Sequence, residues 1–170
     1  MEEAQKKIIV ILGSHRSGTS IITKLSACYG YSLTNNLIAG NKYNEKGYFE
    51  DQDIVDFNEM LLAEMEASWN SNLFITNKQF DIINISTNLE AAKNLIHNKF
   101  FDHKKIVIKD PRISILLPFW KNVFSEIDVD VKYICPLRNP FEVSNSMMKR
   151  DGISLSYGHV LWSIYNLDII

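Results

Sequence analysis

The segment GSHRSGTS, near the amino terminus, has the residue types and spacing of an anion-binding loop. Gly13, Gly18 and Ser20 follow the phosphate-loop pattern G-x-x-x-x-G-K-S/T. Thr19 stands where that pattern has a lysine, the residue that reaches the β- and γ-phosphates of a nucleoside triphosphate. The segment therefore predicts a phosphate loop of altered chemistry, in which Arg16 supplies the positive charge.

The elements on either side of this loop must position it. Residues 7–12 are nearly all apolar and predict a central parallel strand, and residues 19–29 predict a helix. The expected buried side of that helix carries Ile21, Ile22, Leu25 and Cys28. In such an arrangement the turn amides and the positive end of the helix dipole favour an oxyanion at one point.

Strands and helices alternate along the rest of the chain. We predict strands at 105–109 and 131–137, and helices at 51–67, 87–101, 116–125, 140–150 and 157–170. Residues 34–48 predict a long loop, and residues 69–86 have no clear periodicity. This alternation predicts an α/β domain in which helices flank a parallel sheet. Gly13, Lys109 and Arg138 come at or just beyond strand ends, where such sheets bind ligands.

Composition narrows the class of protein. The chain has 170 residues, 46% of them hydrophobic and 22% charged, which fits a single globular domain. Its net charge of −2 gives no overall attraction to nucleic acid or to an anionic membrane. Cys28 and Cys135 are expected to be buried thiols, and the start of the chain shows no signal peptide or membrane span, so we expect a cytoplasmic protein.

The loop GSHRSGTS resembles the 5′-phosphosulfate loop of sulfotransferases, in particular bacterial sulfotransferase-like proteins with an HRSGTS loop. More distantly the chain is similar to tyrosylprotein sulfotransferases. The resemblance implies a fold like that of phosphate-loop nucleoside triphosphatases and the cofactor 3′-phosphoadenosine 5′-phosphosulfate (PAPS). It also implies transfer of a sulfuryl group to a hydroxyl, for example on a saccharide. Sulfotransferases continue with a C-terminal segment over the cofactor, which we expect this chain to lack.

The resemblance assigns roles to the loop. The amides of Ser17, Gly18, Thr19 and Ser20 would bind the 5′-phosphate of the cofactor. Arg16 would neutralise the charge that builds on the bridging oxygen as the sulfuryl group leaves.

A second group of residues lies in the segment LRNPFEVSNS. Sulfotransferases have an arginine and a serine at the spacing of Arg138 and Ser146, and these hold the 3′-phosphate. An arginine can grip a phosphate with two parallel hydrogen bonds. Ser144 is an alternative to Ser146 for the second contact.

Proton transfer and charge neutralisation need further groups. Glu50, in KGYFED, resembles the glutamate that acts as general base in tyrosylprotein sulfotransferases, with Asp51, Asp53 and His15 as alternatives. Lys109, in IKDPR, matches the lysine of a similar segment that helps to hold the sulfuryl group.

Two other functions remain open from the sequence. A phosphate-loop kinase or nucleoside triphosphatase would need the lysine that Thr19 replaces and an aspartate for magnesium. A non-catalytic nucleotide-binding module would bind the cofactor without turnover. We expect no metal, because sulfuryl transfer needs none and no Cys/His spacing indicates zinc. Acceptor identity and oligomeric state cannot be predicted from the sequence.

Overall fold

The computed structural model describes residues 5–40, 47–72, 74–80, 85–100, 102–167 and 169. Its centre is a sheet of four parallel strands in the order β2-β3-β1-β4. The strands are β1 (Lys6–Ile11), β2 (Ser32–Leu33), β3 (Lys105–Lys109) and β4 (Val129–Ile134). The predicted α/β class and parallel sheet are therefore confirmed.

β1 lies between β3 and β4, and its last four residues are buried. Ile9 pairs with Val107 on one side and with Lys132 on the other. Side chains alternate between the faces, so that Ile8 and Val10 enter a large core while Ile9 and Ile11 enter a smaller one. A strand covered on both faces needs a continuous apolar run, which is what residues 8–12 provide.

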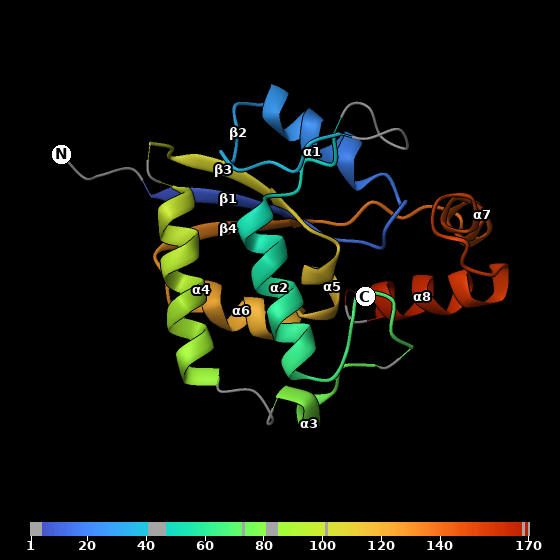
Figure 1. Cartoon of the computed structure of the whole chain (residues 1–170). Helices are drawn as coiled ribbons and strands as arrows, with labels where there is room; N and C mark the ends of the chain where they lie inside the picture. The colour runs from blue at the N-terminus through green and yellow to red at the C-terminus, as the bar shows by residue number, and fades with distance from the viewer. Residues whose placement is uncertain are drawn as a thin grey trace.

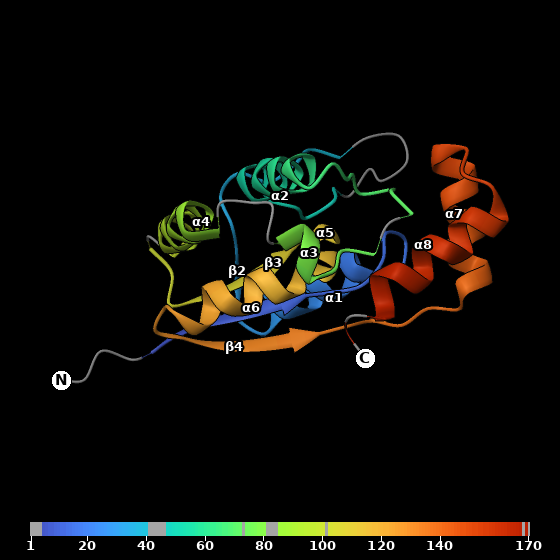
Figure 2. The same cartoon turned by 90° about the horizontal axis from the view of Figure 1, so that it is seen from below.

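Helices cover both faces of the sheet, but unequally (Figures 1 and 2). Of the helices that the structure describes, only α1 (Thr19–Cys28) covers one face. The other face carries α2 (Gln52–Glu64), α4 (Ile85–Lys99), α5 (Arg112–Ile115) and α6 (Leu117–Ser125), with the short α3 (Asn77–Phe80) nearby. The predicted helix positions in these regions are confirmed to within a few residues.

The predicted buried side of α1 is wrong for three of its four residues, and only Ile22 packs against the core as predicted. Ile21 and Leu25 are 67% and 52% exposed, and Cys28 is exposed as well. The helix instead buries Thr23 and Ser26 against the sheet. Their hydroxyls donate to backbone carbonyls one turn earlier, at 2.9 Å and 3.0 Å. These polar groups therefore keep a hydrogen-bond partner when they are buried.

α7 (Pro140–Asp151) and α8 (Leu155–Leu167) pack against each other, with their axes crossing steeply, at the end of the molecule where the strands finish (Figure 1). Asn139 caps α7 by accepting from the amide of Phe141 at 2.9 Å. Gly152, in the left-handed conformation, ends the helix. At the crossing, Gly158 lies directly against Ser144.

A methyl group at residue 158 has no room. The Cβ of an alanine there would lie 2.8 Å from the Cβ of Ser144 and 2.9 Å from its Cα. We expect Gly158→Ala to lower the free energy of unfolding by about 1–3 kcal/mol through overpacking. Chemical denaturation checks this, with the exposed Ser156→Ala as control. Equal stability of the two variants would contradict the close packing of α7 on α8.

Other differences from the sequence prediction are small. β4 begins at Val129 and ends at Ile134, two residues before the predicted start and three before the predicted end, and the two-residue β2 was not predicted. Residues 41–46 of the predicted loop, residue 101 of the predicted helix 87–101, and residues 168 and 170 of the predicted helix 157–170 lie outside the described residues. None of the helices in the described part of the chain is long and apolar enough to cross a membrane.

Candidate functional site

The loop after β1 contains three residues with positive φ. Gly13 and Gly18 have φ of 119° and 98°, and Arg16 has φ of 68°, which is unusual for a residue with a side chain. The hydroxyl of Ser17 donates to the carbonyl of Ser14 at 2.7 Å, which closes the turn. The amide of Gly13 donates a hydrogen bond to a residue outside the loop, Ser114, whose Oγ is 2.8 Å away. Backbone strain of this kind is typical of binding loops.

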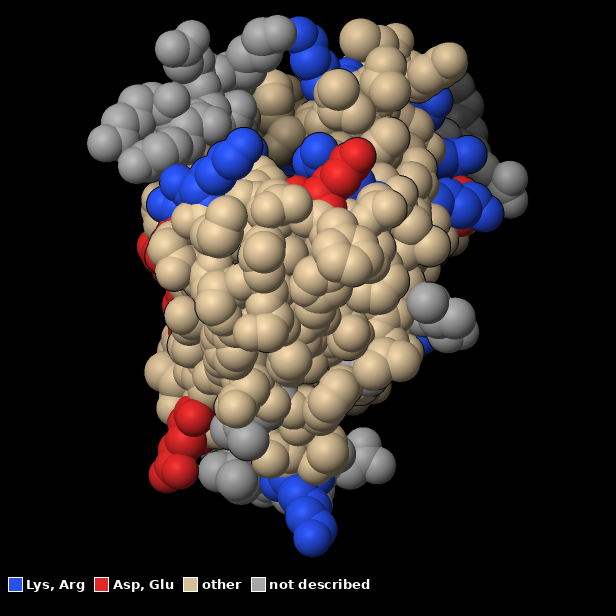
Figure 3. All heavy atoms as spheres, turned by 90° about the vertical axis from the view of Figure 1, so that its right-hand side faces the viewer, with Lys and Arg blue, Asp and Glu red and all other residues tan. Residues whose placement is uncertain are grey.

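A cavity of about 260 Å³ opens over this loop. Its walls come from the loop, the first turn of α1, the segment before α2, the end of β3 and the start and end of α7. They consist of His15, Arg16, Gly18, Thr19, Ser20, Ile21, Tyr48, Glu50, Lys109, Pro111, Arg138 and Arg150. Figure 3, which faces the α7–α8 end of the molecule, shows basic side chains gathered on its upper part around a small acidic area.

The first turn of α1 offers free donors to this cavity. α1 begins at Thr19, and the residue before it, Gly18, has no side chain to cap the helix. Within the described residues, no backbone carbonyl accepts from the amides of Gly18, Thr19 or Ser20. Uncapped amides at the positive end of a helix dipole bind anions. The predicted loop residues thus reach the cavity, except Ser17, which is buried beneath it.

Glu50 and Lys109 meet at the floor of the cavity. Lys109 Nζ forms an ion pair with Glu50 Oε1 and donates to the carbonyl of Tyr48 at 3.2 Å. Arg112 Nη1 lies 3.9 Å from the second carboxylate oxygen of Glu50. The backbone of Glu50 is fixed by its carbonyl, which accepts from the amide of Ile38 at 2.8 Å. Residues predicted separately as base and cation are therefore in direct contact.

The alternative bases Asp51 and Asp53 are engaged elsewhere. Asp51 caps α2 by accepting from two amides, and its Oδ1 lies 2.7 Å from Lys99 Nζ. Asp53 pairs with the same lysine and accepts from Asn36 at 2.8 Å. This ion pair with Lys99 lowers the pKa of Asp53. Neither residue lines the cavity, so the geometry favours Glu50 over both.

Asp110, directly after β3, holds Arg112 in place beside the cavity. Its carboxylate is fully buried and accepts from Asn58 at 2.8 Å and from Arg112 at 2.8 Å. Arg112 also pairs with Glu59. Burial acts to lower the pKa of Arg112, but these two carboxylates outweigh it and raise the pKa. The network therefore holds a charged guanidinium beside Glu50 at every physiological pH.

Arg138 and Ser146 are brought together through Arg16. Arg138 Nη1 donates to the carbonyl of Arg16 at 3.1 Å, and Arg16 Nε donates to Ser146 Oγ at 2.8 Å. Arg138 lines the cavity, whereas Ser146 contacts it only through the Arg16 side chain. Ser144, the alternative to Ser146, is fully buried beneath Gly158 and cannot reach a ligand in this arrangement.

His15 is held rigidly at the rim of the loop. Its ring packs edge-on against Trp69, with centroids 4.8 Å apart, and against Tyr165 at 5.7 Å. Burial first, and then the nearby cations led by Arg112 and Arg150, keep the pKa of His15 well below 6.5. The imidazole is therefore neutral at neutral pH.

The neutral state of His15 makes stability depend on pH. In the unfolded chain the imidazole gains a proton below about pH 6.5, whereas in the folded protein it does not, so folding is opposed as the pH falls. Between about pH 7.5 and about pH 5.5, we expect wild type to lose about 1.4 kcal/mol more unfolding free energy than His15→Gln. Urea titrations at both pH values measure this difference. Parallel pH profiles would show that His15 accepts a proton freely in the folded state.

Several contributors to the site carry no recognisable motif. Arg150, at the end of α7, lines the cavity and lies 5.9 Å from the ring centroid of Trp69. Burial and then Arg150 lower the pKa of Arg16 from 12.5. Trp162 Nε1, on α8, donates to the carbonyl of Arg138 at 3.1 Å and so fixes the backbone between β4 and α7. Only the tertiary structure shows these roles.

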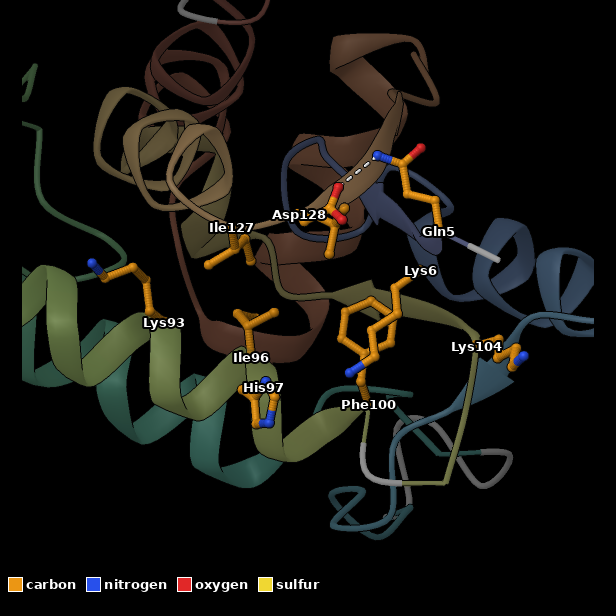
Figure 4. Close-up of a pocket in the computed structure, with 10 residues that line it drawn as sticks. Gln5, Lys6, Lys93, Ile96, His97, Phe100, Lys104, Ile127 and Asp128 are labelled. Carbon is orange, nitrogen blue, oxygen red and sulfur yellow. Dashed lines mark hydrogen bonds between the residues drawn. The ribbon is translucent and has the colours of Figure 1, made fainter. Parts of the chain in front are cut away.

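A second cavity, of about 360 Å³, lies at the opposite edge of the sheet, where the strands begin (Figure 4). Ile96, Phe100 and Ile127 form its apolar part, and Lys6 Nζ lies 5.4 Å from the Phe100 ring centroid. None of the site residues predicted from the sequence lines it. In the described part of the chain, no group of three or more His, Cys, Asp or Glu side chains gathers as a metal site.

No protein-family model, curated protein or solved structure matches this chain. The functional argument therefore depends on the cavity over the loop and on the groups that surround it.

Proposed function

We propose that this chain is a sulfotransferase that moves a sulfuryl group from PAPS to an acceptor hydroxyl. The observation that carries the proposal is the convergence of Arg16, Lys109 and Glu50 with free helix amides on one cavity. A transferred anionic group needs donors and cations around it, and its acceptor needs a base. The phosphate-loop fold expected of sulfotransferases agrees with a parallel sheet of order 2-3-1-4 and a helix after the first strand.

The residues fit the phosphosulfate end of the cofactor. The amides of Gly18, Thr19 and Ser20 would hold the 5′-phosphate, as anions are held at helix N-termini. Arg16 would sit beside the bridging oxygen and Lys109 beside the sulfuryl oxygens. Thr19 replaces the lysine of nucleoside triphosphatases, which makes a triphosphate a poorer match.

In the transfer step, Glu50 accepts the proton of the acceptor hydroxyl. The acceptor oxygen forms the new bond to sulfur, and the bond from sulfur to the bridging oxygen breaks. Arg16 and Lys109 neutralise the charge on the departing phosphate and on the sulfuryl oxygens. The ion pair between Lys109 and Glu50 keeps both side chains at the point of transfer. When the cofactor binds, its sulfuryl oxygens would replace Glu50 as the partner of Lys109. 3′-Phosphoadenosine 5′-phosphate (PAP) leaves.

Arg138 is the proposed contact for the 3′-phosphate. We expect Arg138→Ala to weaken PAP binding by about 1.5–3 kcal/mol, the scale of a hydrogen bond to a charged group. Calorimetric titration measures this loss. Arg138→Lys keeps the charge but not the planar fork, so it should bind with intermediate affinity. The side chain is 43% exposed, so folding should be unaffected. Wild-type affinity in the alanine variant would remove Arg138 from the site.

Transfer itself can be followed with PAPS labelled in its sulfuryl group. The purified chain is incubated with labelled PAPS and a panel of saccharides, phenols and alcohols, in the absence of magnesium. Label should move to at least one hydroxyl acceptor and PAP should accumulate. Binding of PAPS without transfer to any acceptor would instead indicate a non-catalytic nucleotide-binding module. A requirement for magnesium and ATP would indicate a kinase or nucleoside triphosphatase.

A further inference from the structure

β4 forms one edge of the sheet and presents unpaired backbone groups. It pairs with β1 on one side and is the last strand in the order (Figure 2). The carbonyl of Ile134 accepts from the amide of Leu12 at 2.9 Å and so faces β1. Because backbone groups alternate along a strand, those of Val131 and Tyr133 face outward. Within the described residues, no backbone group bonds to them on that side. Such an edge is a template for another strand.

The side chains along this edge are apolar or oppositely charged. Asp130 and Lys132 are two residues apart and therefore lie on the same face of the sheet. Lys132 is 69% exposed, and the two charges are 3.6 Å apart. Tyr133 and Ile134 are 39% and 37% exposed, which is high for apolar residues of a strand. A lysine normally protects an edge from pairing, but here an acid of the same strand can neutralise it.

These features select one register for pairing with an identical strand. Antiparallel pairing centred on Val131 places Asp130 of each copy opposite Lys132 of the other. It also sets Val129 opposite Tyr133, and it joins the outward backbone groups of the two Val131 residues. Centring on Asp130 or on Lys132 would instead set like charges directly against each other, which is destabilising. The charge pattern of β4 is thus complementary to itself about Val131.

We propose that β4 pairs with β4 of a second copy of this chain, in antiparallel orientation about Val131. The two-fold axis is perpendicular to the sheet, so the sheet continues across both copies with its faces aligned. The strands of the two copies run in opposite directions, which places the two loop cavities at opposite ends of the dimer. Pairing and ligand binding are therefore separable, and the proposal is independent of the proposed function.

Charge exchange at residues 130 and 132 tests the pairing. Sedimentation equilibrium is measured for the wild-type chain, for Asp130→Lys, for Lys132→Asp and for the double exchange. Each single variant puts like charges opposite each other in two places, and we expect dimer dissociation constants at least tenfold above wild type. A mixture of the two single variants restores complementarity and should form heterodimers. The double exchange should form homodimers with close to wild-type affinity.

Controls separate this pairing from general association. Lys121→Asp makes the same change in net charge as Lys132→Asp, but on an exposed face of α6, and should leave the dimer intact. Circular dichroism and unfolding midpoints verify that each variant folds. A monomeric wild type would overturn the proposal. So would single variants that dimerise as tightly as wild type, or a mixture that associates no better than its components.

Discussion

Glu50→Gln is expected to lower the rate of sulfuryl transfer by about 10²–10⁴-fold, the contribution of a positioned general base. The amide has the shape of the carboxylate and can still accept from Lys109 through its oxygen, so the contact is kept, although the buried Lys109 charge left without a counter-charge should make the variant less stable. It cannot take a proton from the acceptor hydroxyl. PAP affinity should therefore stay within about threefold of wild type while turnover is lost.

Single-turnover transfer and calorimetry on the same preparations measure the two quantities. Asp56→Asn makes the same chemical change at an exposed position of α2 and serves as the control. If Glu50→Gln turned over at the control rate, Glu50 would not be the base. His15, which is neutral and lines the same cavity, would then be the residue to substitute next.

Lys109→Met is expected to lower the free energy of unfolding by about 3–5 kcal/mol. Glu50 and Lys109 are 7% and 4% exposed, so their charges have little access to water. Without the lysine, the nearest cation to the carboxylate is Arg112, whose Nη1 is 3.9 Å away. Removing one partner of a buried pair costs far more than the pair contributes, because an uncompensated charge remains inside.

The double variant identifies the cause of that loss. Lys109→Met combined with Glu50→Gln removes both charges of the buried ion pair. The double variant should therefore unfold at a higher denaturant concentration than Lys109→Met alone. The interaction energy in such a cycle should be about 1–3 kcal/mol. Additive effects of the two substitutions would mean that the residues do not depend on each other, contrary to their contact in the structure.

The fold could be predicted where the chain itself carries the pattern. The apolar run of β1 and the Asn139–Pro140 start of α7 are local signals, and both elements form where expected. The face of α1 could not be predicted in this way. Its apolar stripe suggests burial of Ile21 and Leu25, but the loop fixes where the helix begins and hence which side meets the sheet.

Part of the candidate site could likewise be predicted from local sequence, and part could not. The loop from Gly13 to Ser20 is contiguous, so its spacing alone indicates an anion site. The contact of Glu50 with Lys109 joins residues 59 positions apart and depends on β3 lying beside the segment before α2. Arg150 enters the cavity only because α7 folds back along the carboxyl edge of the sheet. No local pattern contains this information.

Binding of PAP tests the central claim most directly. The purified chain is titrated calorimetrically with PAP in magnesium-free buffer and, separately, with ATP and magnesium. We predict micromolar PAP binding that weakens in Arg138→Ala, and no measurable binding of ATP. Binding of ATP with magnesium but not of PAP would contradict the account, because the loop would then serve a nucleoside triphosphate. Absence of binding by either nucleotide would contradict the cofactor assignment for this chain.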